Sequence, residues 1–213
     1  ELEKHHQVAT RVVVVDLAAR DGADRLLEAV SDLEIGILVN NAGFGSAGRF
    51  EGQDRERMRE MVELNCMAPV LLTSVLLPGM CERGRGALII VGSIAGSQPL
   101  PLHTLYSATK AFANVFGEAL WGELQGSGVD SLAVLPGTTE TEFQAVSGEL
   151  PHEGESADSV VAKSLDALGR KPSLIPGVYN WLRGNAGTRL LPRSVLAIAA
   201  RIVMAKRIPQ ERR

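Results

Sequence analysis

Residues 93–110 read S-I-A-G-S-Q-P-L-P-L-H-T-L-Y-S-A-T-K, and this stretch decides how the rest of the chain is interpreted. A strand-like run over residues 87–91 leads to Ser93, a Gly/Pro-rich loop follows, and Tyr106 and Lys110 begin a helical pattern. Residues four apart lie on one helix face, so we expect the Lys110 ammonium beside the Tyr106 phenol. Because a nearby positive charge favours a phenolate, the sequence predicts a lowered Tyr106 pKa and proton exchange near neutral pH, with Ser93 contacting the same oxygen of a ligand.

Strand-like and helix-like segments alternate along the chain. Short β-branched apolar runs are typical of buried parallel strands, and apolar residues spaced three and four apart are typical of helices that cover a sheet. The predicted strands are residues 12–15, 35–39, 87–91, 131–135 and 173–176, and the predicted helices are residues 21–33, 54–81, 104–125 and 159–168. This alternation predicts an α/β fold with a doubly wound parallel sheet, in which ligands bind beyond the carboxyl ends of the strands.

Composition favours a single domain over residues 1–213 with a mostly aliphatic core. The chain has 213 residues with only 4% aromatics, and its two cysteines fall in helical patterns, as expected of reduced thiols in a cytoplasmic protein. No apolar run approaches the length of a membrane span, and the first residues do not read as a signal peptide. His5 and His6 have no other Cys or His at ligand spacing, so no metal site is expected.

Charge is unevenly distributed, although the net charge is only −3. Residues 1–162 carry a formal charge of −12 and residues 163–213 carry +9, which favours an anionic surface as partner of the C-terminal part. Residues 178–213 form a basic segment that contains an amphipathic helical pattern. Its apolar face consists of Val195, Ile198, Ala199, Ile202 and Val203. Such a helix either lies on a membrane surface or caps the core of its own protein, and the pattern leaves both open.

Two further motifs accompany Ser93, Tyr106 and Lys110. Asn-Asn-Ala-Gly at residues 40–43 and Pro-Gly-x-x-x-Thr at residues 136–141 each follow a predicted strand. Together these motifs make nearly the whole chain resemble the short-chain dehydrogenases/reductases, which have a Rossmann-like fold. The resemblance implies an NAD(P)-dependent oxidoreductase that transfers a hydride between a nicotinamide cofactor and a carbonyl or alcohol substrate. The catalytic residues that it implies are Asn65, Ser93, Tyr106 (the general acid/base) and Lys110.

The implied cofactor is NAD or NADP, with a leaning to NADP that no residue of this sequence decides. By resemblance, Lys110 holds the nicotinamide ribose, residues 16–17 lie near the adenine, and the turn at residues 136–141 cradles the nicotinamide and pyrophosphate. Gly43 is expected to allow close backbone approach to the cofactor. The residues assigned to cofactor binding are Asp16, Leu17, Asn40, Asn41, Ala42, Gly43, Tyr106, Lys110, Pro136, Gly137 and Thr141.

Asn65 and Pro69 stand four residues apart inside the long helical pattern of residues 54–81. Proline lacks the N–H that would bond the carbonyl four residues earlier, so the helix is expected to bend and leave the Asn65 carbonyl free. One interpretation is a simple proline kink with a solvated asparagine. The family resemblance implies the other, in which this carbonyl holds a water of a proton relay through Lys110.

Two loops need separate interpretation. Residues 43–48 fit G-x-G-x-x-G, but no apolar-periodic helix follows and no acidic residue ends a second strand, so a flexible rim loop is predicted. Residues 141–158 are polar and weakly patterned, which is typical of a mobile segment over a substrate or of a disordered loop. His103 and His152 are expected at the surface.

The resemblance also sets an expectation about the start of the chain. Family members begin with a strand, a turn of the type T-G-x-x-x-G-x-G, a helix and a second strand, and none of these precedes residues 12–15, which would then be the third strand. In the strand order 3-2-1-4-5-6, loss of strands 1 and 2 leaves residues 35–39 at an exposed sheet edge. We expect an incomplete copy of a longer protein, with pairing to another subunit as the alternative.

Two classes of function remain open. As an enzyme, the chain would act on a small carbonyl or alcohol substrate, with no nucleic-acid partner. Family members commonly pair the helices at residues 54–81 and 104–125 between subunits, so a homodimer or tetramer is expected, in the cytoplasm with membrane association as an option. The alternative is a catalytically silent remnant that acts through self-association or membrane contact and binds no cofactor.

Overall fold

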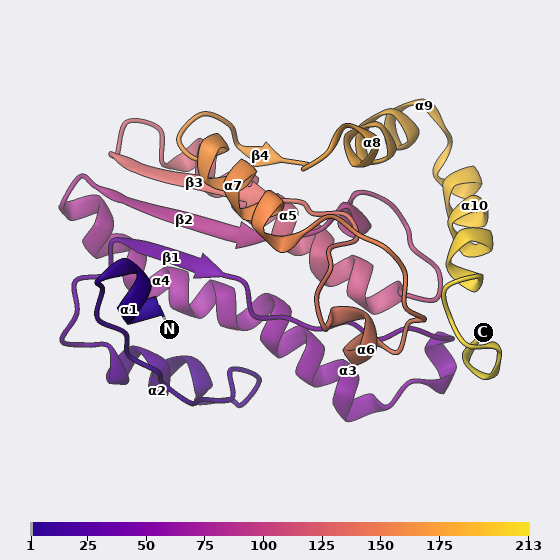
Figure 1. Cartoon of the computed structure of the whole chain (residues 1–213), viewed down its shortest axis with the longest axis horizontal. Coiled ribbons are helices and arrows are strands. Elements are labelled where there is room, and N and C mark those ends of the chain that lie inside the picture. The colour runs from indigo at the N-terminus through magenta and orange to yellow at the C-terminus, as the bar shows by residue number, and fades with distance from the viewer. Residues whose placement is uncertain (1) are drawn as a thin grey trace.

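The computed structural model describes residues 2–213, without the side chains at positions 183, 186 and 187. Its sheet has four parallel strands in the order β1-β2-β3-β4 (Figure 1). These strands are β1 (Ile37–Asn40), β2 (Gly86–Val91), β3 (Val129–Val134) and β4 (Ser173–Leu174). All four lie where the sequence predicts a strand, and because the strands are parallel, their carboxyl ends meet at one edge of the sheet.

Helices cover both faces of the sheet, which confirms the doubly wound α/β fold (Figure 1). The longer helices are α2 (Gly22–Ala29), α3 (Arg55–Val62), α4 (Ala68–Glu82), α5 (Thr104–Glu123), α7 (Ala157–Ala167) and α10 (Arg193–Ala205). The shorter ones are α1 (Leu2–His6), α6 (Phe143–Ser147), α8 (Val178–Trp181) and α9 (Thr188–Leu190). Helices α4 and α5 pack on one face of the sheet and α7 packs on the other.

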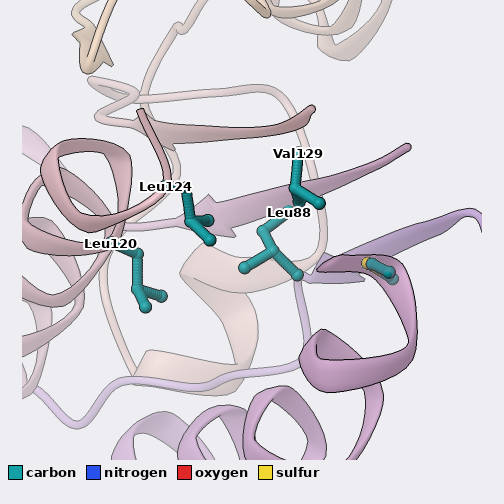
Figure 2. Close-up of a cluster of buried hydrophobic side chains, with 5 residues drawn as sticks. Leu88, Leu120, Leu124 and Val129 are labelled. Atoms are coloured by element: carbon teal, nitrogen blue, oxygen red, sulfur yellow. The ribbon is translucent and has the colours of Figure 1, made fainter. Parts of the chain in front are cut away.

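Aliphatic side chains fill the layers on both sides of the sheet. On one side Met80, Leu88, Leu120, Leu124 and Val129 join α4, α5, β2 and β3 (Figure 2). On the other side the β2 and β3 residues Ile89, Leu132 and Val134 meet Val160 and Ala167 of α7. Burial of one such side chain contributes roughly 1.5–3 kcal/mol, so these contacts hold the strand ends and α5 in a fixed relation.

The predicted strand at residues 12–15 is wrong. This segment forms no strand, and Val12 and Val14 are 86% and 90% exposed. A β-branched run becomes a buried strand only where a neighbouring strand pairs with its backbone, and no described residue pairs with this one. The exposed sheet edge expected near residues 35–39 is present, because among residues 2–213 β1 pairs only with β2, and Ile37 and Val39 are 56% and 52% exposed.

The long helix predicted from residue 54 runs through α3, a π-helical turn η2 (Glu63–Met67) and α4. Asp54 caps it by accepting a hydrogen bond from the Arg57 N–H at 2.8 Å. The helix over residues 55–82 is long enough to cross a membrane and contains an 18-residue window with a mean hydropathy of 1.6, unlike the expectation from the sequence. In the fold this helix contributes Met80 to the core beneath the sheet, which accounts for part of its apolar character.

The C-terminal segment wraps one end of the molecule (Figure 1). After β4 the chain passes through α8, a π-helical stretch η4 (Leu182–Gly187), α9 and α10. The buried stripe of α10 is Leu196, Ala200 and Met204, and Met204 and Ile208 pack against Ala47. The amphipathic helical pattern predicted within residues 178–213 is therefore confirmed in α10. Its predicted apolar face, however, is largely the outward one, because Ile198 and Ile202 are exposed.

Candidate active site

Ser93 follows β2 at the carboxyl edge of the sheet and is held there by Asn114 of α5. The Ser93 N–H donates to Asn114 Oδ1 at 3.1 Å, and Asn114 Nδ2 donates to the Ser93 carbonyl at 2.9 Å. The Ser93 hydroxyl donates to the Pro136 carbonyl at 3.3 Å and accepts from the Ala95 N–H at 3.1 Å. These bonds join the ends of β2 and β3 to α5 and fix the direction of the serine side chain.

Tyr106 lies in the first turn of α5 with its ring enclosed. The ring packs against Phe143 of α6 at 5.2 Å between centroids and against His103 at 6.2 Å. Burial raises the pKa of Tyr106 above its ordinary value, a hydrogen bond with the Ser93 hydroxyl opposes the rise, and Glu149 adds to it. The predicted lowering of this pKa is wrong for this site, because loss of hydration outweighs the opposing effect of the Ser93 hydroxyl.

Lys110 lies on the same face of α5 as Tyr106, as its spacing predicts. Its Nζ is 5.9 Å from the centre of the Tyr106 ring and donates a hydrogen bond to the Val91 carbonyl at 2.7 Å. The side chain is buried, and this burial lowers the Lys110 pKa to about 8, with a smaller opposing effect from Cys66. The ammonium is thus anchored to the end of β2 and held beside the phenol.

Asn65 lies in the π-helical turn η2, four residues before Pro69, and its side chain joins two parts of the site. Nδ2 donates to the Phe44 carbonyl at 2.9 Å and to Thr109 Oγ1 at 3.0 Å, and Oδ1 accepts from the Phe44 N–H at 3.1 Å. The asparagine is buried rather than solvated, which removes the simple kink interpretation. A Cβ on Gly43 would lie 2.9 Å from Asn65 Oδ1, so the asparagine itself requires the glycine.

A cavity of about 910 Å³ extends from these residues along the carboxyl edge of the sheet. Its walls come from the ends of β1, β2 and β3, from α5, from residues 141–157 and from α10. The predicted site residues that line it are Asn41, Gly43, Ser93, Tyr106, Lys110, Pro136, Gly137 and Thr141. The segment predicted at residues 141–158 lies over the site through Phe143, as a cover for a substrate would.

The other residues predicted to bind the cofactor do not line the cavity. Asp16 and Leu17 do not line the cavity, and the Asp16 carboxylate accepts from the Ala18 N–H at 2.9 Å within a turn. Asn40 is buried, and its Nδ2 donates to Thr73 Oγ1 at 3.3 Å. Ala42 does not line the cavity either. Residues 43–48 form a loop and lead into a 3₁₀ turn rather than a long helix, as predicted, but the loop is not a flexible rim because Phe44 and Ala47 are buried in hydrophobic clusters.

Three side chains near the site were not foreseen. The predicted surface position of His103 is wrong, because this residue is 2% exposed. Neither of its ring nitrogens has a hydrogen bond to any described residue. Its Nε2 lies 3.7 Å from the Glu149 carboxylate, which is itself buried. Asn114 stands four residues after Lys110 on the same helix face, and only this spacing could have indicated it.

The residues at this edge fit the nicotinamide part of a dinucleotide. Gly43 and Gly137 keep side chains out of the cavity wall, Thr141 offers a hydroxyl beside it, and Lys110 supplies a cation. Within residues 2–213, no glycine-rich strand-to-helix turn is placed to receive a pyrophosphate. The described residues therefore fit one half of such a cofactor.

Comparisons with known proteins agree with this geometry. A family model described as short chain dehydrogenase matches residues 1–150. The very-long-chain 3-oxoacyl-CoA reductase of Homo sapiens is 36% identical over 140 residues, which cover 64% of this chain and 45% of that protein. Its Mus musculus counterpart is 29% identical over 196 residues, which cover 90% of this chain and 62% of that protein.

One solved structure that resembles this fold is a short-chain dehydrogenase from Sphingobium yanoikuyae in complex with NADPH. It is 29% identical, with a TM-score of 0.78, and the match covers 98% of this chain and 80% of that chain. The chain spans about half to three-fifths of the length of the two curated relatives.

Proposed function

The chain belongs to the short-chain dehydrogenase/reductase family, and on this premise we propose that it forms the catalytic part of an NAD(P)-dependent carbonyl reductase. The observation that carries the proposal is the placement of Ser93, Tyr106 and Lys110 at one end of a cavity, with Asn65 behind them. The Ser93 hydroxyl lies close enough to the Tyr106 hydroxyl to influence its pKa, so both could contact a single substrate oxygen.

Each residue of the site has a separate role in carbonyl reduction. The nicotinamide cofactor supplies the hydride when it is bound. Tyr106 donates a proton to the carbonyl oxygen, because its phenol is protonated at neutral pH. Ser93 donates a hydrogen bond to the same oxygen and orients it towards the phenol.

Lys110 and Asn65 support Tyr106 and are not proposed to contact the substrate oxygen. The ammonium of Lys110 lies beside the Tyr106 ring, where it would favour the phenolate that remains after proton transfer. Asn65 ties the loop after β1 to α5 through Phe44 and Thr109 and so holds two walls of the site together. We include its backbone carbonyl in the proposal as the anchor of a proton-relay water.

The substrate class proposed is a lipophilic ketone. The cavity wall is largely apolar beyond the catalytic group, with Val134, Leu100 and Met204 among its residues. The curated relatives are reductases of very-long-chain 3-oxoacyl-CoA, and an oxo group on a long acyl chain would suit such a wall. NADPH, which the Sphingobium yanoikuyae dehydrogenase binds, is the first cofactor to test.

The test is a Tyr106→Phe variant, which removes the proton donor and keeps the ring packing against Phe143. Titration with NADPH and NADH, followed by cofactor fluorescence, measures binding, and a panel of long-chain ketones measures turnover. Retained cofactor binding with turnover lowered by roughly 100-fold or more supports the proposal. Unchanged turnover contradicts it, and saturable cofactor binding excludes the silent remnant that is the rival function.

The proposal extends to assembly and location. Exposed apolar residues on α4 and α5, namely Leu71, Val75, Phe112 and Val115, suit pairing of these helices with a second copy, in a homodimer or tetramer. The proposed location is the cytoplasm.

A further inference from the structure

We propose that α8, α9 and α10 form a docking surface for anionic lipid bilayers. This proposal does not rest on the proposed function. We call this surface the C-terminal face. It is defined by Val178, Tyr179, Trp181, Leu182, Leu190, Leu191, Val195, Ile198, Ile202 and Val203.

Large apolar side chains of the C-terminal face are exposed to an unusual degree. Val178 is 78% exposed, Leu190 is 80% exposed and Ile198 is 65% exposed. Such side chains are common singly on protein surfaces, but a concentration of them marks a contact with a protein or a membrane. Figure 1 shows α8, α9 and α10 following one another around one end of the molecule.

Helix α10 packs against the core through one face only, and the apolar residues on its opposite face do not contact the core. Leu196, Ala200 and Met204 recur every fourth residue and are buried. Ile198 and Ile202, also four apart, lie on the opposite side and are exposed. The helix therefore caps the core and still presents an apolar stripe outwards, so the two roles that the sequence left open do not exclude each other.

Basic residues beside this apolar stripe favour an anionic lipid surface as the partner. Arg189, Arg193, Arg201 and Lys206 are exposed, and none of them has a carboxylate within ion-pair distance in residues 2–213. From residue 178 onwards the only acidic residue in the sequence is Glu211. Cations next to exposed apolar side chains fit anionic headgroups above acyl chains, where lysine and arginine stems also bury their methylenes. A second copy fits poorly, because two such faces would repel each other.

The cavity and the C-terminal face share the same elements. Met204 and Arg207 of the α10 segment line the cavity, as does Gly184 of η4. Arg207 also donates a hydrogen bond to Thr138 Oγ1 at 3.3 Å, which ties this wall to the turn after β3. Met204 belongs to the buried stripe of α10, so this helix lies between the cavity and the C-terminal face.

The experiment is flotation of the chain with vesicles of phosphatidylcholine alone and of phosphatidylcholine with phosphatidylserine. Two double variants probe the face: Ile198→Ser with Ile202→Ser, and Arg201→Glu with Lys206→Glu. Matched controls change exposed residues elsewhere: Val12→Ser with Val14→Ser, and Arg20→Glu with Arg25→Glu. Thermal unfolding of each variant verifies that it is folded.

We expect binding to the anionic vesicles only, weakened roughly 30-fold or more by loss of the two cations and abolished by the serine pair, with both controls unchanged. Equal binding to both vesicle types, or equal loss in the controls, overturns the proposal. If light scattering shows a doubled mass that the serine pair abolishes, a second copy covers the face and the proposal is wrong. Flotation needs no turnover, so an active Tyr106→Phe variant would refute the proposed function and leave lipid docking standing.

Discussion

Asn114 holds the backbone of Ser93 with both ends of its side-chain amide, at 3.1 Å and 2.9 Å. The serine sits on the loop after β2 and the asparagine sits on α5, two turns after Tyr106. One amide group therefore sets the position of the serine relative to the helix that carries the phenol. A Cβ on Gly92 would lie 1.9 Å from Asn114 Oδ1, so the glycine before the serine leaves room for this clamp.

Replacing Asn114 by Leu should lower turnover by up to about 100-fold, because a small displacement of a catalytic group is costly. The Ser93 N–H and carbonyl would lose partners in a buried place, which adds a loss of roughly 1–3 kcal/mol of stability for each. Steady-state kinetics and urea unfolding measure the two effects. Gly122→Ala is the control, because a Cβ at Gly122 meets nothing within 4 Å. Normal turnover in Asn114→Leu would contradict a positioning role.

Asn65→Asp should lower the free energy of unfolding by roughly 2–4 kcal/mol. The carboxylate cannot donate to the Phe44 carbonyl or to Thr109, so two buried acceptors lose their donor. Urea unfolding at pH 7 measures the change. In Asn185→Asp the lost bond is to the Trp181 carbonyl at an exposed position, so little change is expected there. Equal effects in the two variants would show that the Asn65 bonds do not matter.

Lys110 should make stability depend on pH in the alkaline range. Its pKa is lowered from 10.5 to about 8 in the folded chain, so between these values the unfolded chain binds more protons than the folded one. The contribution of Lys110 to the free energy of unfolding therefore increases as the pH rises from about 8 to about 10.5, and it decreases over the same range as the pH falls. The difference in unfolding free energy between wild type and Lys110→Met, measured across this range, should show that slope. A flat difference would mean that the lysine is not desolvated.

His103 should limit stability in mild acid. Burial lowers the pKa of His103 below the ordinary 6.5. Glu149 weakly opposes this shift, and Arg207, Arg212 and His152 weakly add to it. The unfolded chain therefore takes up a proton first as the pH falls below 6.5, and stability decreases in that window.

His103→Leu should remove this acid loss and preserve stability at pH 7.5, since both ring nitrogens lack hydrogen bonds in the folded chain. Unfolding at pH 7.5 and pH 5.5 tests the prediction, and His6→Leu, at an exposed position, is the control. A variant that keeps the full acid sensitivity of the wild type would rule out His103 as its source.

The sequence by itself determined the order of strands and helices and the positions of the motifs. Strand and helix periodicities are local, so residues 87–91 and 104–125 could be assigned without knowledge of their neighbours, and Tyr106 and Lys110 share a helix face through spacing alone. Residues 12–15 were predicted wrongly because a β-branched run records a preference, and pairing requires a partner strand that the described residues do not provide.

Tertiary structure alone decided the burial of each group and therefore its chemistry. It raised the Tyr106 pKa where a charge argument predicted the reverse, enclosed His103, and turned Ile198 and Ile202 of α10 outwards. It also brought Asn114 to Ser93 and Asn65 to Phe44, each across 21 positions of the chain. The physical reason is that hydration is lost through contacts between residues far apart in sequence, whereas sequence spacing reports only neighbours on one element.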